Sequence, residues 1–259
     1  MVRPAKFDES QILDSARGLV AMHGPAAATM SAIARSVRAP TGSIYHRFES
    51  REVLLGEVWL RTAEAFQDAY FEVLRGISAR DAGLAAALFF VGRVRADLAE
   101  ARVLLLHRRE DFVDRGWPPA MEERAKRLKL QVDTELRDFS RRLSGRADPR
   151  TLRLVTYAVL DAPFAAVRRH VAANEIPPPY LDLPITATYR AVLSLLGVPP
   201  DQREPLDAAR RPGPPARAEP LPPPPARKLR RAVAGPRLSD RAADEPKRRS
   251  PWRSATTLM

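Results

Sequence analysis

The chain has 259 residues, enough for one or two domains with a sizeable core, and its hydrophobic fraction of 45% is that of a globular protein. Its formal net charge of +12 favours polyanionic partners or a basic tail. Because cysteine is absent, disulfides, thiolate metal sites and a cysteine nucleophile are excluded. No apolar run is long enough to span a bilayer and the first ten residues lack a secretory signal, so we expect a soluble cytoplasmic protein.

Two helices are expected before residue 38. Apolar residues recur at helical spacing from 8 to 23, and the Gly-Pro pair at 24–25 ends that segment. Thr29 can then cap a second helix with the sequence MSAIARSV. A longer first helix thus precedes a short second one.

The segment PTGSIYHRF, residues 40–48, predicts a third, short helix. Pro40 suits its first position, where the N–H would be unpaired anyway, and Ile44 and Phe48 give one apolar face. The polar side chains left outside that face are Thr41, Ser43, Tyr45, His46 and Arg47. Two short helices joined by a tight turn and braced by a longer one make a helix-turn-helix, which reads DNA with its exposed face. On spacing alone, a buried helical hairpin with incidental polar residues is an equal alternative.

A longer pattern runs through TMSAIARSVRAPTGSIYHRFESREVLL, residues 29–55. Thr is followed by Ile-Ala, a turn, Gly-Ser-Ile-Tyr and Phe, and then by Ser-x-Glu-x-Leu. With these residues, the chain from 7 to 60 resembles the N-terminal domain of the TetR family of bacterial transcriptional regulators. Three positions depart from the family: Arg38 replaces the turn Gly, Pro40 the capping Ser, and Arg51 a Lys. Arg38 is expected to take a positive φ or to contact DNA.

The resemblance implies a homodimer that binds double-stranded DNA at a pseudo-palindromic operator, with the third helix of each subunit in the major groove. The implied DNA contacts are Thr29, Arg38, Thr41, Gly42, Ser43, Tyr45, His46 and Arg51. Thr29 and Arg51 are expected to anchor phosphates, and residues 41–43 to read bases. Arg3 and Lys6 are expected to reach a neighbouring phosphate or the minor groove.

The predicted fold is all-α. A three-helix helix-turn-helix DNA-binding domain, residues 1–52, precedes a helical-bundle ligand-binding and dimerisation domain, residues 53–198. Beyond residue 75, helices are expected near 80–100, 101–115, 119–145, 149–173 and 180–197. Pro163 lies inside one of them and should kink it.

Two apolar stripes on the last two expected helices are candidates for pairing with a second copy in a four-helix bundle. The first comprises Leu152, Val155, Val159, Ala162, Pro163, Ala166 and Val167, and the second comprises Ile185, Tyr189, Val192, Leu193 and Leu196. The resemblance favours pairing between copies. The alternative is that both stripes belong to the core of a single chain.

A cavity for a small hydrophobic effector is expected among the central helices. Its candidate lining residues are Phe89, His107, Phe112, Trp117, Tyr157 and Phe164, with Phe90 and Leu104 as further candidates. His107 follows an apolar run and would give such a cavity a polar group that orients the ligand. Each of these side chains is alternatively plain core, and His107 an exposed or capping residue.

Residues 199–259 differ in composition from the rest of the chain. They hold 14 of the 25 prolines and, with 14 Lys and Arg against 7 Asp and Glu, +7 of the +12 charge. Proline breaks helices and few large apolar residues remain to be buried. We therefore expect a disordered Pro/Arg-rich C-terminal tail, which can add non-specific phosphate contacts.

No pattern supports catalysis. The four histidines are scattered without metal-ligand spacing, and nucleophile-elbow, phosphate-loop and dinucleotide motifs are absent. We expect neither an enzyme nor a metal or cofactor. The expected function is a DNA-binding transcriptional regulator, a homodimeric repressor released by a small hydrophobic effector. The alternatives are a ligand-independent regulator or activator, or an interaction adapter that acts through the proline-rich tail.

Overall fold

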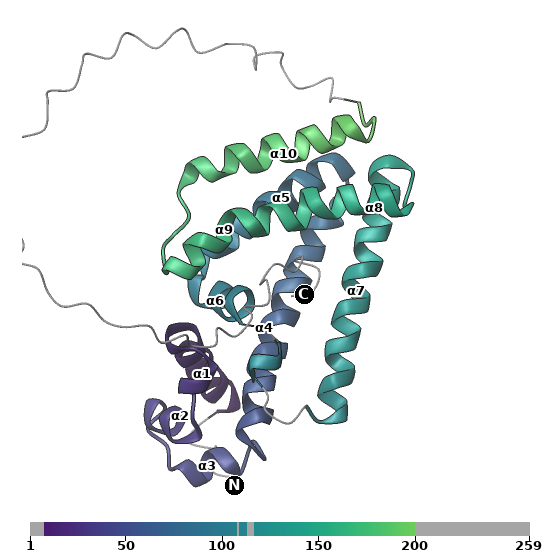
Figure 1. The fold of residues 1–259 in the computed structure, drawn as a ribbon. Helices are drawn as coiled ribbons and strands as arrows, with labels where there is room; N and C mark the ends of the chain where they lie inside the picture. The colour runs from purple at the N-terminus through teal and green to yellow at the C-terminus, as the bar shows by residue number, and fades with distance from the viewer. Residues whose placement is uncertain (1–7, 108, 113–116, 200–259) are drawn as a thin grey trace, which may run out of the picture. The chain divides into compact units, whose positions relative to one another are not determined.

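Helices dominate the residues that the computed structural model describes, which are 8–107, 109–112 and 117–199 (Figure 1). No strand occurs in these ranges, so the predicted all-α class is confirmed there. Within the same ranges, no helix combines the length and the apolar character needed to cross a membrane. Apart from Pro199, the predicted tail of residues 199–259 lies outside the described residues, as do Arg3 and Lys6.

Local signals set the first helices. The elements are α1 (Glu9–His23), the 3-10 turn η1 (Pro25–Ala27), α2 (Met30–Ser36) and α3 (Thr41–Tyr45). Asp8 caps α1 and forms a capping box with Gln11, and Gly24 ends it with a φ of 81°. Thr29 caps α2, since its Oγ1 accepts from the N–H of Ala32 at 3.1 Å. The sequence predicted these ends because each depends on side chains adjacent in the chain.

The first three helices pack together through apolar residues of the chain's core. Ile33 of α2 and Ile44 of α3 are fully buried, and Phe48, just after α3, is 3% exposed. They belong to the same apolar cluster as Ile12 and Val20 of α1, and α2 contacts both α1 and α3. Burying a side chain of this size contributes roughly 1.5–3 kcal/mol. The apolar cluster therefore fixes which face of α3 points outward.

α4 (Arg51–Leu74) connects the first three helices to the rest of the fold. Ser50 caps it by accepting from the N–H of Val53 at 3.2 Å. The helix contacts α1, α5, α6 and α7, and buried residues recur along its whole length. The predicted boundary between residues 52 and 53 falls in its first turn.

The remaining helices follow the predicted order. They are α5 (Ala79–Ala96), α6 (Leu98–Leu106), η2 (Arg109–Phe112), α7 (Pro119–Ser144), α8 (Pro149–Thr156), η3 (Tyr157–Asp161), α9 (Ala162–Ala173), η4 (Pro179–Leu181) and α10 (Asp182–Leu195). The helix expected over 101–115 is the main difference, because α6 begins at Leu98, where Asp97 caps it, and ends at Leu106. The helix expected over 149–173 is present, but η3 interrupts it.

The interruption η3 is a π-helical turn next to Pro163. Proline has no N–H, so it cannot donate to the carbonyl of Val159 four residues earlier. The buried hydroxyl of Tyr70 on α4 donates to that carbonyl at 2.9 Å. Burial, reinforced by the charge of Asp161, raises the pKa of Tyr70 above its usual range, so the hydroxyl keeps its proton. The predicted disturbance at Pro163 is thus a π turn completed from another helix.

The second predicted apolar stripe lies inside the chain, so the interpretation that it pairs with a second copy is wrong. The first stripe lies only partly inside, because Leu152, Ala162 and Ala166 are half-buried, and its pairing with a second copy stays a prediction. All five residues of the second stripe are buried, with Tyr189 2% exposed, and so are Val155, Val159 and Val167 of the first. The helices α9 and α10 pack on α5 with these faces. For the second stripe the alternative, intramolecular core, holds because helical spacing identifies an apolar face but not what covers it.

Arginine side chains join helices that are distant in sequence. The guanidinium of Arg102 on α6 donates to the carbonyl of Ala21 in α1 and, at 2.9 Å, to the carbonyl of Val171 in α9. Arg124 of α7 donates to two carboxylates of α4, those of Glu64 and Glu57, and these hydrogen bonds raise the pKa of its guanidinium. The contacts of Arg102 satisfy carbonyls near helix ends, and the contacts of Arg124 fix α7 against α4.

Candidate nucleic-acid interface

The turn between α2 and α3 places Arg38 in the left-handed region, with a φ of 56°. The N–H of Arg38 donates to the carbonyl of Arg35 at 3.1 Å, and the N–H of Ala39 donates to that of Ala34 at 2.9 Å. These two bonds form a Schellman motif, in which glycine usually occupies the position of Arg38. The predicted positive φ is confirmed, and the side chain of Arg38 is exposed.

The start of α3 differs by one residue from the prediction. Pro40 is the N-cap residue, not the first helical residue, and its side chain makes no capping hydrogen bond. Its carbonyl accepts from the N–H of Ser43 at 2.9 Å. Without a side-chain cap, α3 lacks a contact worth about 1 kcal/mol, and its five helical residues depend on the packing of Ile44.

The outer face of α3 carries the predicted reading residues. Thr41, Gly42 and His46 are exposed, Tyr45 is 53% exposed, and Ser43 is half-buried. A Cβ added at Gly42 would meet no atom within 4 Å, so the backbone there is open to a close partner. The structure therefore brings these five residues together on one accessible surface.

Two predicted phosphate anchors have structural contacts of their own. Thr29 is exposed, but its Oγ1 caps α2. The guanidinium of Arg51 donates to the carbonyl of Pro25 and, at 3.1 Å, to that of Ala28. Arg51 thus ties the start of α4 to the loop before α2, a positioning role that the sequence pattern did not indicate. Its phosphate contact stays a prediction.

Exposed residues on α2 extend the same surface beyond the predicted set. Ser31 and Arg35 are exposed, and the Oγ of Ser31 lies 3.2 Å from the Oγ1 of Thr29. Sequence reasoning missed them because it concentrated on α3. Their helical position, on the side of α2 away from the buried Ile33, was the available signal.

The six predicted effector contacts occupy separate surroundings. Phe89 packs on Phe66 with ring centroids 5.3 Å apart, His107 lies near Phe112 at 6.2 Å, and Trp117 near Trp59 at 5.6 Å. Phe164 is buried, whereas Tyr157 is 50% exposed. The role of the six residues in effector binding stays a prediction.

His107 lies beside the corner that ends α1. A Cβ added at Gly24 would meet the Cε1 of His107 at 3.6 Å. Burial lowers the pKa of His107, Arg102 adds to this effect, and Asp111 opposes it. The histidine therefore belongs to the contact between α1 and the segment after α6.

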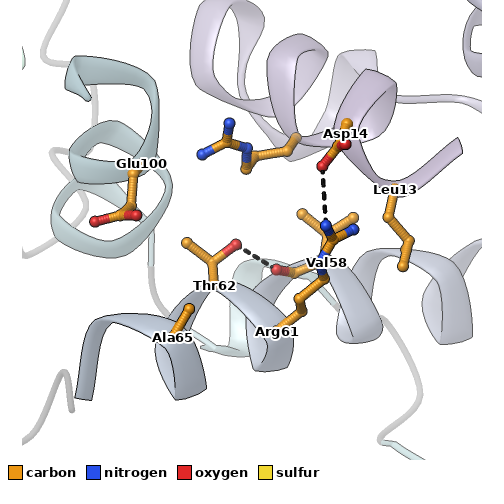
Figure 2. A pocket seen from close by; sticks show the side chains of 8 residues that line it. Leu13, Asp14, Val58, Arg61, Thr62, Ala65 and Glu100 are labelled. Atoms are coloured by element: carbon orange, nitrogen blue, oxygen red, sulfur yellow. Dashed lines mark hydrogen bonds and ion pairs between the residues drawn. The ribbon is translucent and has the colours of Figure 1, made fainter. Parts of the chain in front are cut away.

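A cleft of about 190 Å³ lies between α1, α4 and α6, and none of the six predicted effector contacts lines it (Figure 2). Its charged lining residues are Asp14 and Arg17 of α1, Arg61 of α4 and Glu100 of α6. Burial raises the pKa of Glu100, although its ion pair with Arg93 opposes the shift. Within the described ranges, no group of three or more His, Asp or Glu side chains has the arrangement of a metal site.

A capped helix start lies next to this cleft. Asp97 accepts from the N–H of Glu100 at 2.9 Å and from the Nη1 of Arg17 at 2.8 Å. Burial alone would raise the pKa of Asp97, but these two donors outweigh it and lower the pKa. The ion pair between Arg17 and Asp97 therefore joins α1 to the start of α6.

Comparison with known proteins identifies the first part of the chain. Residues 12–58 match the family model described as bacterial regulatory proteins, tetR family. The chain carries the N-terminal helix-turn-helix domain of the TetR family. The predicted family is thereby confirmed, and the surface of α3 belongs to a TetR-family domain. No curated protein sequence matches the chain significantly.

Solved structures share the fold of the larger part of the chain. The fatty acid degradation regulator FadR from Bacillus halodurans is 19% identical, with a TM-score of 0.53, over 73% of this chain and 97% of that one. A TetR-like transcriptional regulator from Rhodococcus sp. RHA1 is 19% identical, with a TM-score of 0.56, over 74% and 98%. Another transcriptional regulator from Rhodococcus sp. RHA1 is 18% identical, with a TM-score of 0.57, over 75% and 100%. At these identities, the likeness shows a shared fold alone.

Proposed function

We propose that this chain is a homodimeric transcriptional repressor that binds a pseudo-palindromic operator through α3 and releases it when a small hydrophobic effector binds. The observation that carries the proposal is the exposed face of α3, supported from beneath by Ile44 and Phe48, on a TetR-family domain. The function requires a DNA-binding part, residues 1–52, and a dimerisation and effector part, residues 53–198.

In the proposed complex, residues Thr41 to Ser43 read base edges in the major groove. Their small size lets the backbone approach closely, and two hydroxyls offer donors and acceptors. Tyr45 and His46 contact phosphates beside the groove, and Arg38 adds a charge at the turn. The formal charge on residues 1–50 is only +2, from six basic and four acidic residues, so strong binding needs two copies on one operator.

An exposed apolar stripe on α10 supports the dimer. It comprises Leu183, Ala187, Ala191 and Leu195, which recur every four residues on the side opposite the buried stripe. Leu183 and Leu195 are 73% and 69% exposed, and Tyr157 of η3 adds a half-exposed ring. Small residues between larger ones let two helices approach closely. Pairing of this face with its copy would remove it from water.

The dimer is tested by light scattering on the purified chain. Leu183→Glu together with Leu195→Glu should convert a dimer into a monomer, because charges would replace apolar contacts on the stripe. The matched control is Leu130→Glu on α7, where leucine is also exposed, at 64%. A wild-type monomer at micromolar concentration would contradict the dimer.

DNA binding is tested by a gel shift on the DNA upstream of the chain's own gene. Wild type should bind it in a sequence-dependent and salt-sensitive way. Thr41→Ala should relax base preference with a loss of about 1–3 kcal/mol at one base pair, whereas Tyr45→Ala should weaken binding to all sequences alike. Met22→Ala, at an exposed position on α1, serves as control. Binding that ignores sequence would contradict an operator-specific repressor.

A long-chain fatty acid is the first effector probe. The sequence favours a hydrophobic effector, and one solved structure that shares the fold is named as a fatty acid degradation regulator. Palmitate should raise the melting temperature of the protein and reduce its binding to the operator. The methyl ester of palmitate tests whether the carboxylate is needed, and a short-chain fatty acid tests whether the long tail is needed. Operator binding that no hydrophobic probe alters would favour the ligand-independent regulator.

A further inference from the structure

The cleft between α1, α4 and α6 is lined by none of the six predicted effector contacts. Its volume of about 190 Å³ is roughly that of six water molecules, which suits a small molecule and not a long acyl chain. Val58 and Ala65 of α4 and Leu13 of α1 supply its apolar lining. The hydroxyl of Thr62 already donates to the carbonyl of Val58 at 2.6 Å. Figure 2 marks this hydrogen bond with a dashed line.

The charged groups of the cleft are unequally satisfied. Both oxygens of Glu100 accept from the guanidinium of Arg93, which neutralises that carboxylate. Among the described residues, Arg17 makes a single hydrogen bond, from Nη1 to Asp97, and Arg61 only approaches Asp14, with Nη2 and Oδ1 3.4 Å apart. A guanidinium has five N–H donors. The two arginines therefore keep most of their donors for water or for a ligand.

We propose that this cleft binds a small organic monocarboxylate. Its carboxylate would accept from the N–H donors of Arg61 and Arg17, in the forked geometry that arginine favours for carboxylates. Its apolar part would lie on Val58 and Ala65, in place of water. A cationic ligand fits less well, since the buried acid, Glu100, is already paired with Arg93.

Binding there would act on α1. Each arginine now contacts an acid on another helix: Arg17 of α1 meets Asp97 at the start of α6, and Arg61 of α4 meets Asp14 of α1. A bound carboxylate competes with both acids for these guanidinium groups. Loss of these ion pairs would loosen the attachment of α1 to α4 and α6. Because α1 packs against α2, which contacts α3, this change would alter the position of α3. This consequence rests on the proposed DNA-binding function, whereas carboxylate binding does not.

Calorimetric titration of the full chain with benzoate tests the site, with benzamide as the neutral match of the same shape. Benzoate should bind saturably at one site per chain, and benzamide should not. Arg61→Gln should weaken benzoate binding about tenfold, because a charged hydrogen-bond partner is lost. Arg127→Gln, at an exposed arginine of α7 outside the cleft, should leave the affinity unchanged. Arg61 is 45% exposed, so its replacement should not prevent folding.

A second variant tests the space itself. Ala65→Leu fills the cleft from an exposed position of α4 without changing its charge, and it should abolish benzoate binding. The proposal is overturned if benzoate and benzamide bind alike, if neither benzoate nor butyrate binds saturably, or if Arg61→Gln and Ala65→Leu both bind as wild type does. Benzoate titration without DNA tests carboxylate binding in the cleft, and operator binding without benzoate tests the proposed repressor. Failure of one hypothesis can therefore be distinguished from failure of the other.

Discussion

The first three helices and the helices from α5 onward are held by different kinds of contact. In the first part, Thr29 caps α2 through a residue three positions away. In the second, Arg102 of α6 reaches the carbonyl of Val171, 69 residues away, and the hydroxyl of Tyr189 reaches the carbonyl of Arg80, 109 residues away. The difference shows why the first part follows a recognisable sequence pattern: its geometry depends on neighbours in the chain, and long-range contacts decide the second.

The largest expected effect is a substitution where two distant helices meet on α5. A Cβ at Gly83 would collide with the hydroxyl of Tyr189 and lie 2.7 Å from the Cζ of Phe139. Gly83→Ala should destabilise the fold by about 1–3 kcal/mol, measured by urea denaturation. Gly92→Ala on the same helix meets no atom within 4 Å and should instead stabilise it by about 0.5–1 kcal/mol. Equal changes in the free energy of unfolding for the two variants would contradict the view that contacts between distant helices hold the second part together.

The π turn offers the next largest effect. Tyr70→Phe removes the donor to the Val159 carbonyl and should cost about 1–3 kcal/mol, because a buried acceptor is left unpaired. In a Pro163→Ala background, residue 163 regains an N–H, so the same change should cost less. Denaturation of the two single variants and the double variant gives the coupling between them. Purely additive costs would show that the hydroxyl does not compensate for the proline.

In the first part, the corresponding test concerns one residue in the turn. Arg38→Gly should stabilise the chain by roughly 1 kcal/mol, since glycine takes the left-handed conformation without the steric cost that arginine bears. Arg35→Gly, inside α2, should destabilise it by about 1 kcal/mol. Thermal denaturation measures both. If Arg38→Gly is destabilising, contacts of the arginine side chain outweigh its backbone strain.

The smallest expected effect is a pair of opposite pH trends at the start of α6. The pKa of Asp97 is lowered from 3.8, so its contribution to stability is present above that pH and is lost as the pH falls through the lower folded value. The pKa of Glu100 is raised from 4.5, so its contribution is present below that pH and is lost as the pH rises through the higher folded value. Solvent screening should keep each change below about 1 kcal/mol.

The variants Asp97→Asn and Glu100→Gln separate these trends by urea denaturation between pH 3 and pH 7. The free energy of unfolding of Asp97→Asn should lie below that of wild type, and this difference should shrink as the pH falls. The free energy of unfolding of wild type relative to Glu100→Gln should instead increase as the pH falls. Parallel trends for the two variants would contradict the assignment of the ion pairs. The same measurement tests whether the tie between α1 and α6 contributes to folding.

The candidate site was predictable to the extent that it follows the chain locally. Ile44 and Phe48, four residues apart, were predicted to be the buried face of α3, and both are buried. Thr41, Gly42, Tyr45 and His46 are therefore exposed, as predicted. The positive φ of Arg38 followed from the glycine usual at that turn. The contact of Arg51 with the loop carbonyls was not predictable, because it joins residues 23 and 26 positions apart.

The sequence by itself determined the helices, the ends of most of them, the outward face of α3 and the TetR-family domain, since periodicity, caps and short motifs act between near neighbours. The tertiary structure alone decided what covers each apolar face. It turned the stripe of Ile185 and Tyr189 inward and opened a charged cleft beside α1. Helical spacing shows that a face is apolar, but the choice of partner depends on how distant helices fill space together.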